Sequence, residues 1–107
     1  MARDILYLLH PAFASETGVR QFCPDCMIVE GLLATVPGLR EGLDIRYVDF
    51  PRPRQAIVDF VGPEKQGCPL LIRDTPQGRT VTEDMTEILT CLVHAHGVPA
   101  ARGRVVL

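Results

Sequence analysis

Short apolar runs separated by glycine and proline predict the strands of this chain. Asp4 to His10 is almost wholly aliphatic and is bounded by Pro11, which is typical of a buried strand. Leu43 to Phe50 alternates apolar and polar residues, and Gly67 to Arg73 forms a third apolar run. Turn residues at Thr75 to Gly78 predict a hairpin, with a short antiparallel strand returning over Arg79 to Val81.

Three segments carry helical patterns with recognisable ends. The first runs from Pro24 to about Val36 and is stopped by Pro37-Gly38. The second covers Gln55 to Val61. The third starts after Thr82, a suitable N-cap, and ends at Gly97. Pro11 to Phe22 shows no period, so we expect a long loop there.

The resulting order, β-α-β-α-β-β-α, predicts an α/β fold. The first two βα units imply a parallel strand pair, and the hairpin adds antiparallel strands. We therefore expect a mixed four-stranded sheet with helices on both faces. A length of 107 residues suits one domain, residues 1–107, with a core over about 4–97 and a tail over 98–107. The aliphatic end Val105-Val106-Leu107 suggests packing on a partner subunit in a homodimer.

The composition of the chain limits the kinds of partner that we expect it to bind. It is 47% hydrophobic and 22% charged with a net charge of −2, and no run of Lys or Arg points to nucleic acid or an anionic membrane. The apolar run Ile5 to Leu9 is too short for a signal peptide or a membrane span, so we expect a cytoplasmic protein. Arg46, Arg52 and Arg54 are expected to form a solvated basic cluster.

The candidate chemistry is concentrated in Cys23-Pro24-Asp25-Cys26, at the start of the first helix. Thiols spaced in this way can close a disulfide with little backbone movement. The free N–H groups and the positive end of the helix dipole also favour a thiolate on the first sulfur. Four cysteines in a cytoplasmic chain do not suggest a structural disulfide framework. The four-ligand zinc pattern is incomplete, because there is no second C-x-x-C.

The element order, this C-x-x-C motif and the Cys68-Pro69 pair that opens the third strand resemble the thioredoxin superfamily. The layout is most similar to its glutaredoxin-like minimal form, and also to an uncharacterised bacterial family of thioredoxin-like domains of unknown function. The similarity spans residues 4–97. It implies that Cys23 is the exposed nucleophile and Cys26 the more buried resolving thiol. It further implies that Pro69 is a cis-proline whose loop faces the two cysteines and receives a substrate backbone.

The predicted function is that of a thiol–disulfide oxidoreductase, with no cofactor in the protein itself. Its partners would be a disulfide-containing protein or a low-molecular-weight thiol, and a reductase that supplies electrons. The residues expected to contact the substrate surround the two thiols or follow from the resemblance: Phe22, Pro24, Asp25, Cys68, Pro69 and Thr82.

Other interpretations stay open at this stage. Cys68 can be a second resolving thiol, a small apolar residue, or a metal ligand together with Cys23 and Cys26. The fourth ligand would then be His10 or a side chain from the loop Pro11 to Phe22. The chain would then be a non-enzymatic binding module with a metal site or a surface for a protein partner. A third interpretation is a structural domain whose cysteines are inert, since related folds host many functions.

Overall fold

A mixed four-stranded sheet forms the centre of the protein. The structure is a computed structural model and describes residues 3–103. The strands are β1 (Asp4–Leu9), β4 (Leu43–Val48), β5 (Leu70–Thr75) and β6 (Gly78–Thr82), in the spatial order β4-β1-β5-β6. β1 pairs in parallel with β4, whereas the β1–β5 and β5–β6 pairs are antiparallel. The predicted α/β fold and its mixed sheet are therefore confirmed.

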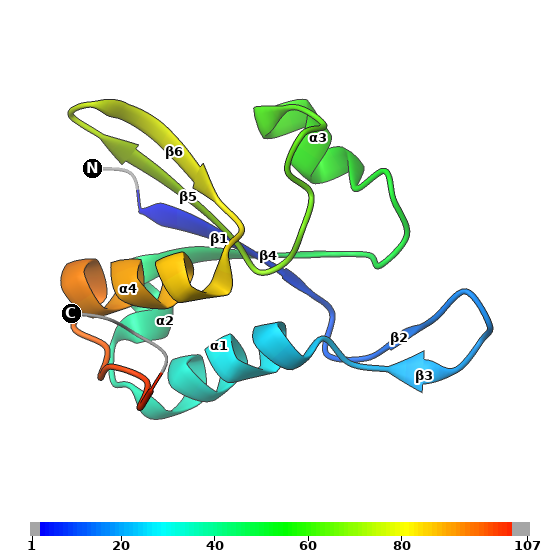
Figure 1. Cartoon of the computed structure of the whole chain (residues 1–107), viewed down its shortest axis with the longest axis horizontal. Coiled ribbons are helices and arrows are strands. Elements are labelled where there is room, and N and C mark those ends of the chain that lie inside the picture. The colour runs from blue at the N-terminus through cyan, green and yellow to red at the C-terminus, as the bar shows by residue number, and fades with distance from the viewer. Residues whose placement is uncertain (1–2, 104–107) are drawn as a thin grey trace.

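Within residues 3–103, four helices flank the sheet in a thioredoxin-like arrangement. They are α1 (Pro24–Thr35), the short α2 (Leu39–Gly42), α3 (Gln55–Val61) and α4 (Met85–His96). Figure 1 shows α1 and α4 on one face of the sheet and α3 on the other. The prediction of helices on both faces is confirmed, whereas α2 was not predicted.

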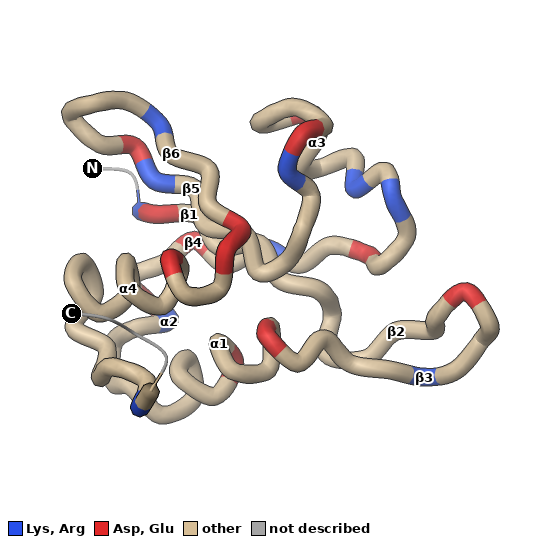
Figure 2. The backbone as a smooth tube through the Cα atoms, viewed as in Figure 1, with Lys and Arg blue, Asp and Glu red and all other residues tan. Residues whose placement is uncertain are grey.

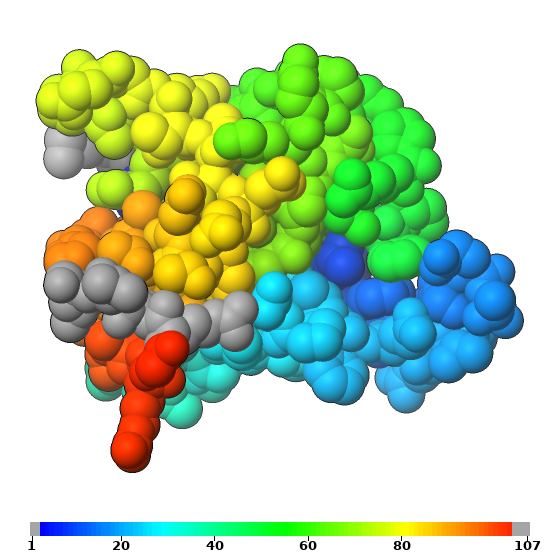
Figure 3. Space-filling model, in the orientation of Figure 1, coloured from blue at the N-terminus to red at the C-terminus, as the bar shows by residue number. Residues whose placement is uncertain are grey.

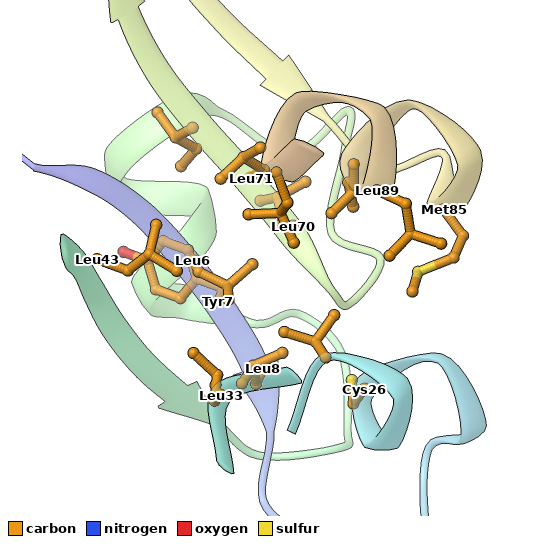
Figure 4. Packing of buried hydrophobic residues seen from close by; sticks show 14 of the residues in the cluster. Leu6, Tyr7, Leu8, Cys26, Leu33, Leu43, Leu70, Leu71, Met85 and Leu89 are labelled. Carbon is orange, nitrogen blue, oxygen red and sulfur yellow. The ribbon is translucent and has the colours of Figure 1, made fainter. Parts of the chain in front are cut away.

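The core lies between the central strands and these helices. Leu6 and Leu8 of β1 are fully buried, as is Ile57 of α3. Leu33 of α1 and Leu89 of α4 approach the sheet from the same side, as Figure 4 shows. β1 is a central strand of the sheet, and helices on both faces of the sheet cover its apolar run, which explains why it does not alternate.

Two local predictions were wrong. The segment expected to be a loop contains a small hairpin, β2 (Phe13–Ala14) paired with β3 (Arg20–Gln21). Strands of two residues are too short to show alternation, and stacking of Phe13 on Phe50, with ring centroids 4.4 Å apart, attaches the hairpin to the rest of the protein.

The N-cap of α4 also differs from the expectation. It is Asp84, whose carboxylate accepts a hydrogen bond from the Glu87 N–H at 3.0 Å. Thr82 instead ends β6 and pairs with Leu71, because the antiparallel ladder continues to that residue.

The C-terminal segment begins against the core, where Val98 is buried. The predicted contact of Val105, Val106 and Leu107 with a partner subunit concerns residues outside the described range. None of the helices within residues 3–103 combines the length and the apolar content that a membrane crossing needs.

Candidate redox site

The site begins where α1 begins. Cys23 is the N-cap of α1 and Pro24 occupies its first turn, where a missing N–H costs nothing. The Cys26 N–H donates a hydrogen bond to Cys23 Sγ at 3.1 Å, and the Met27 N–H donates to Cys23 O at 3.0 Å. The Cys23 sulfur thus takes the position that a capping oxygen occupies in other helices.

The two thiols of the motif differ strongly in their surroundings. Cys23 is half-buried, whereas Cys26 is 1% exposed and packs within the core on the side of α1 that faces the sheet (Figure 4). Burial raises the pKa of Cys26 far above its ordinary value, and its contact with the Cys23 side chain raises it further. The pair therefore combines a half-buried thiol with a buried thiol whose raised pKa keeps it protonated.

Cys68 and Pro69 lie beside this pair. The peptide bond between them is cis, as the resemblance implies. The Cys23 thiol donates a long hydrogen bond to Cys68 O at 3.7 Å. The loop before β5 and the start of α1, which are distant in sequence, therefore form one site.

The loop that carries Cys68 is held from the α4 side by Glu83. The Glu83 carboxylate accepts a hydrogen bond from the Gly67 N–H at 3.1 Å. A Cβ atom on residue 67 would lie 2.8 Å from the same oxygen, so a larger residue there would displace the Glu83 carboxylate. The ammonium group of Lys65 also donates to Val81 O at 3.0 Å. These contacts connect the loop to β6 and to the residue that follows it.

Arg54 holds the same loop from the other side. Its side chain is buried, at 7% exposure. Nη1 donates to Gln66 O at 2.6 Å, while Nε and Nη2 donate to Phe50 O at 3.1 and 2.8 Å. The Arg54 backbone N–H also donates to the Gln66 side chain at 2.7 Å. One guanidinium group therefore joins the segment after β4 to the segment before Cys68.

This position of Arg54 corrects the expectation of a solvated basic cluster. Arg52 is exposed as expected, but Arg54, two residues further on, is not. The ion pairs found between residues 3 and 103 do not include Arg54. Figure 2 shows these basic positions on the segment between β4 and α3. No periodicity or spacing in the sequence distinguishes the two arginines, so sequence reasoning missed this one.

The Cys68 side chain is half-buried, and both Cys23 and the nearby arginines influence its pKa. Burial raises the pKa of Cys68 to about 11, and the negative charge of a Cys23 thiolate acts in the same direction. The guanidinium groups of Arg54 and Arg52 oppose this shift. Cys68 is therefore influenced electrostatically by Cys23, which its carbonyl oxygen contacts, as well as by the two arginines.

The remaining candidate residues lie around the two thiols or further away from them. Phe22 is 57% exposed next to Cys23, and Pro24 is exposed. Asp25 is half-buried within the motif. Thr82 lies at the end of β6, one residue before Glu83. The structure thus brings together Cys23, Cys26, Cys68 and Pro69, and Thr82 pairs with Leu71, two residues after Pro69.

A cavity of about 620 Å³ opens beside Arg54. It is lined by the β2–β3 hairpin, at Ala14, Ser15 and Glu16, and by the segment from Phe50 to Arg54. Figure 3 shows these two parts, blue and green, approaching each other at one end of the molecule. The Phe13–Phe50 stack connects them.

A thiolate metal centre is not assembled in this structure. Within residues 3–103, no three His, Cys, Asp or Glu side chains form a group that could hold a metal ion. His10, the expected fourth ligand, pairs with Asp49 at 3.4 Å and stacks on Tyr47. The alternative of a site made by Cys23, Cys26 and Cys68 therefore gains no support from the geometry.

Comparison with known proteins places residues 3–100 in one family, described as a protein of unknown function (DUF3088). No curated protein and no solved structure matches the chain.

Proposed function

Because the chain belongs to the DUF3088 family, whose function is unknown, we propose from its own site that it is a thiol–disulfide oxidoreductase. The observation that carries this proposal is the asymmetry of the C-x-x-C pair. Cys23 is accessible and accepts a backbone N–H at the start of α1, whereas Cys26 is buried directly behind it. A nucleophile and a resolving thiol need these two environments.

The reaction proceeds in two exchanges. The Cys23 thiolate attacks one sulfur of a substrate disulfide, forming a mixed disulfide and releasing the other substrate sulfur as a thiolate. Cys26 then gives up its proton and attacks the Cys23 sulfur, which closes the Cys23–Cys26 disulfide and releases the second substrate thiolate. The substrate gains two electrons and the protein loses two. A reductase or a small thiol restores the reduced pair.

The surroundings of the pair support each exchange. Backbone N–H groups and the dipole of α1 stabilise negative charge on the Cys23 sulfur. The high pKa of Cys26 keeps it protonated until the mixed disulfide forms, so the two thiols do not repel each other as a pair of thiolates. Phe22 offers an exposed apolar contact next to the nucleophile, and the Cys68–Pro69 loop faces it.

The test is a redox titration of the isolated protein in defined dithiol/disulfide buffers. Free thiols are trapped by alkylation and mapped by mass spectrometry. We expect a reversible Cys23–Cys26 couple with a potential between roughly −270 and −120 mV, the span of known oxidoreductases. Cys23→Ser should abolish the couple, whereas the matched control Cys91→Ser should leave it unchanged, because Cys91 lies on α4. If Cys23 and Cys26 never pair in the native protein, the proposal is wrong.

A further inference from the structure

Cys68 and Arg54 have no part in the two-thiol mechanism, although they lie next to it. Cys68 O accepts the hydrogen bond of the Cys23 thiol, so the third cysteine directly adjoins the nucleophile. Cys68 is half-buried, whereas Cys26 is nearly inaccessible. Of these two neighbours of Cys23, the one outside the C-x-x-C motif is therefore the more exposed.

The surroundings of Cys68 are basic as well as apolar. Arg54, from the segment before α3, contributes positive charge at Cys68, and the exposed Arg52 adds to it. Cys23 faces Cys68 from the start of α1. The Glu83 carboxylate accepts a hydrogen bond from the N–H of Gly67, the residue before Cys68. Arg54 is fixed by hydrogen bonds to Phe50 and Gln66, so its charge stays in place when a thiolate forms. Arg54 therefore anchors the loop before Cys68 and also places a fixed positive charge near its half-buried thiol.

Building on the proposed function, we propose that Cys68 is a second resolving thiol, which attacks the mixed disulfide on Cys23 in competition with Cys26. Arg54 acts as a positioning residue: it anchors the loop that carries Cys68 and supplies the positive charge that favours its thiolate.

The exchange balances without a further reagent. The substrate disulfide is the oxidant, and the first exchange leaves half of it bonded to Cys23. The Cys68 thiol loses its proton to solvent, and its sulfur attacks Cys23 Sγ. A Cys23–Cys68 disulfide forms, the bond between Cys23 and the substrate breaks, and the substrate leaves as a thiolate. A later exchange by Cys26 can convert this disulfide into the Cys23–Cys26 form.

The experiment removes Cys26 and asks whether the mixed disulfide still resolves. The protein carries Cys26→Ser and Cys91→Ser, and a matched variant carries Cys68→Ser in addition. Each reacts with dithiobis(nitrobenzoic acid), whose released thiolate is coloured. With Cys68 present, we expect a second equivalent of coloured thiolate and a Cys23–Cys68 disulfide in the peptide map. Without Cys68, the nitrobenzoate adduct should persist on Cys23.

The pH profile gives a readout that a merely structural role would not change. Below the pKa of Cys68, the thiolate fraction grows about tenfold per pH unit, so the rate of adduct loss should grow by the same factor. An adduct that persists equally in both variants would overturn the proposal. Cys26→Ala replaces Cys26→Ser if the serine variant does not fold. If neither folds, the native protein is quenched with acid during the reaction, and absence of a Cys23–Cys68 disulfide at every time point overturns the proposal.

Failure of this inference is separable from failure of the proposed function. If the native protein forms Cys23–Cys26 but the variant without Cys26 keeps its adduct, only the second resolving thiol is refuted. If the native protein forms no disulfide at Cys23, the oxidoreductase itself is refuted.

Discussion

Replacing Arg54 by methionine tests whether one buried guanidinium group holds the site together. The substitution keeps an unbranched side chain in place of the arginine stem and removes every side-chain donor. Arg54 is 7% exposed, and its donors serve two backbone carbonyl oxygens, Phe50 O and Gln66 O. In the variant neither carbonyl keeps its side-chain partner, whereas the backbone bond from residue 54 to the Gln66 side chain remains.

The expected cost follows from these contacts. A buried acceptor left without a donor costs roughly 1–3 kcal/mol, and here there are two. Loss of the cation–π contact with the Phe50 ring, at 5.8 Å, adds about 0.5–1 kcal/mol. Relief from burying a charge offsets part of this loss. We expect the free energy of unfolding to fall by roughly 3 kcal/mol. Arg54→Lys should lose somewhat less, because lysine keeps the charge but not the planar fork.

The assay is urea unfolding of the fully reduced protein, compared with Arg52→Met. That control removes the same charge from an exposed position two residues away, so its stability should stay within about 0.5 kcal/mol of the native protein. The Arg54 variant should show a lower midpoint with an unchanged slope. If the two methionine variants differ by less than about 1 kcal/mol, the argument from buried donors is refuted.

Three further predictions concern titration and capping. With Cys68 as the sole thiol, its alkylation rate should keep rising to about pH 11, because burial raises its pKa to about 11; a plateau near pH 9 would contradict this. The folded-state pKa of Cys26 is raised, so the unfolded chain loses this proton at a lower pH than the folded protein does. Above about pH 9, the free energy of unfolding of the reduced protein should therefore fall by roughly 1.4 kcal/mol per pH unit more than that of Cys26→Ser. Equal pH slopes of the two proteins in urea unfolding would refute the burial argument. Asp84→Ala should cost about 1 kcal/mol of unfolding free energy through the lost cap of α4, and Asp84→Asn should cost far less, whereas equal losses would show that the cap is not the cause.

Much of the fold could be predicted because its signals are local. The aliphatic run of β1, the proline at the start of α1 and the turn before β6 each depend on neighbouring residues. The N-cap of α4 was misplaced by two residues, since Thr82 and Asp84 both suit a cap and only the length of the β5–β6 ladder decides between them. The hairpin of β2 and β3 was missed for a similar reason, because its anchor, the ring of Phe50, is remote in sequence.

The candidate site divides in the same way. Cys23 and Cys26 could be identified from the sequence because spacing on one helix fixes their proximity. Cys68 and Pro69 came from a resemblance, and the structure then placed Cys68 O against the Cys23 thiol. The prediction that Arg54 is solvated was wrong, because only the tertiary structure shows that its side chain is buried.

By itself, therefore, the sequence determined the order of the strands of the main sheet and of α1, α3 and α4, together with the pair of thiols at the start of α1. Only the tertiary structure decided that Cys26 is buried, that Cys68 adjoins Cys23 and that Arg54 lies inside the protein. The reason is physical: backbone conformation and helix contacts depend on residues a few positions apart, whereas burial and electrostatic field depend on whatever segments the fold brings together. Arg52 and Arg54 have the same chemistry and nearly the same position in the chain, and only the carbonyls of Phe50 and Gln66 around one of them make it part of the site.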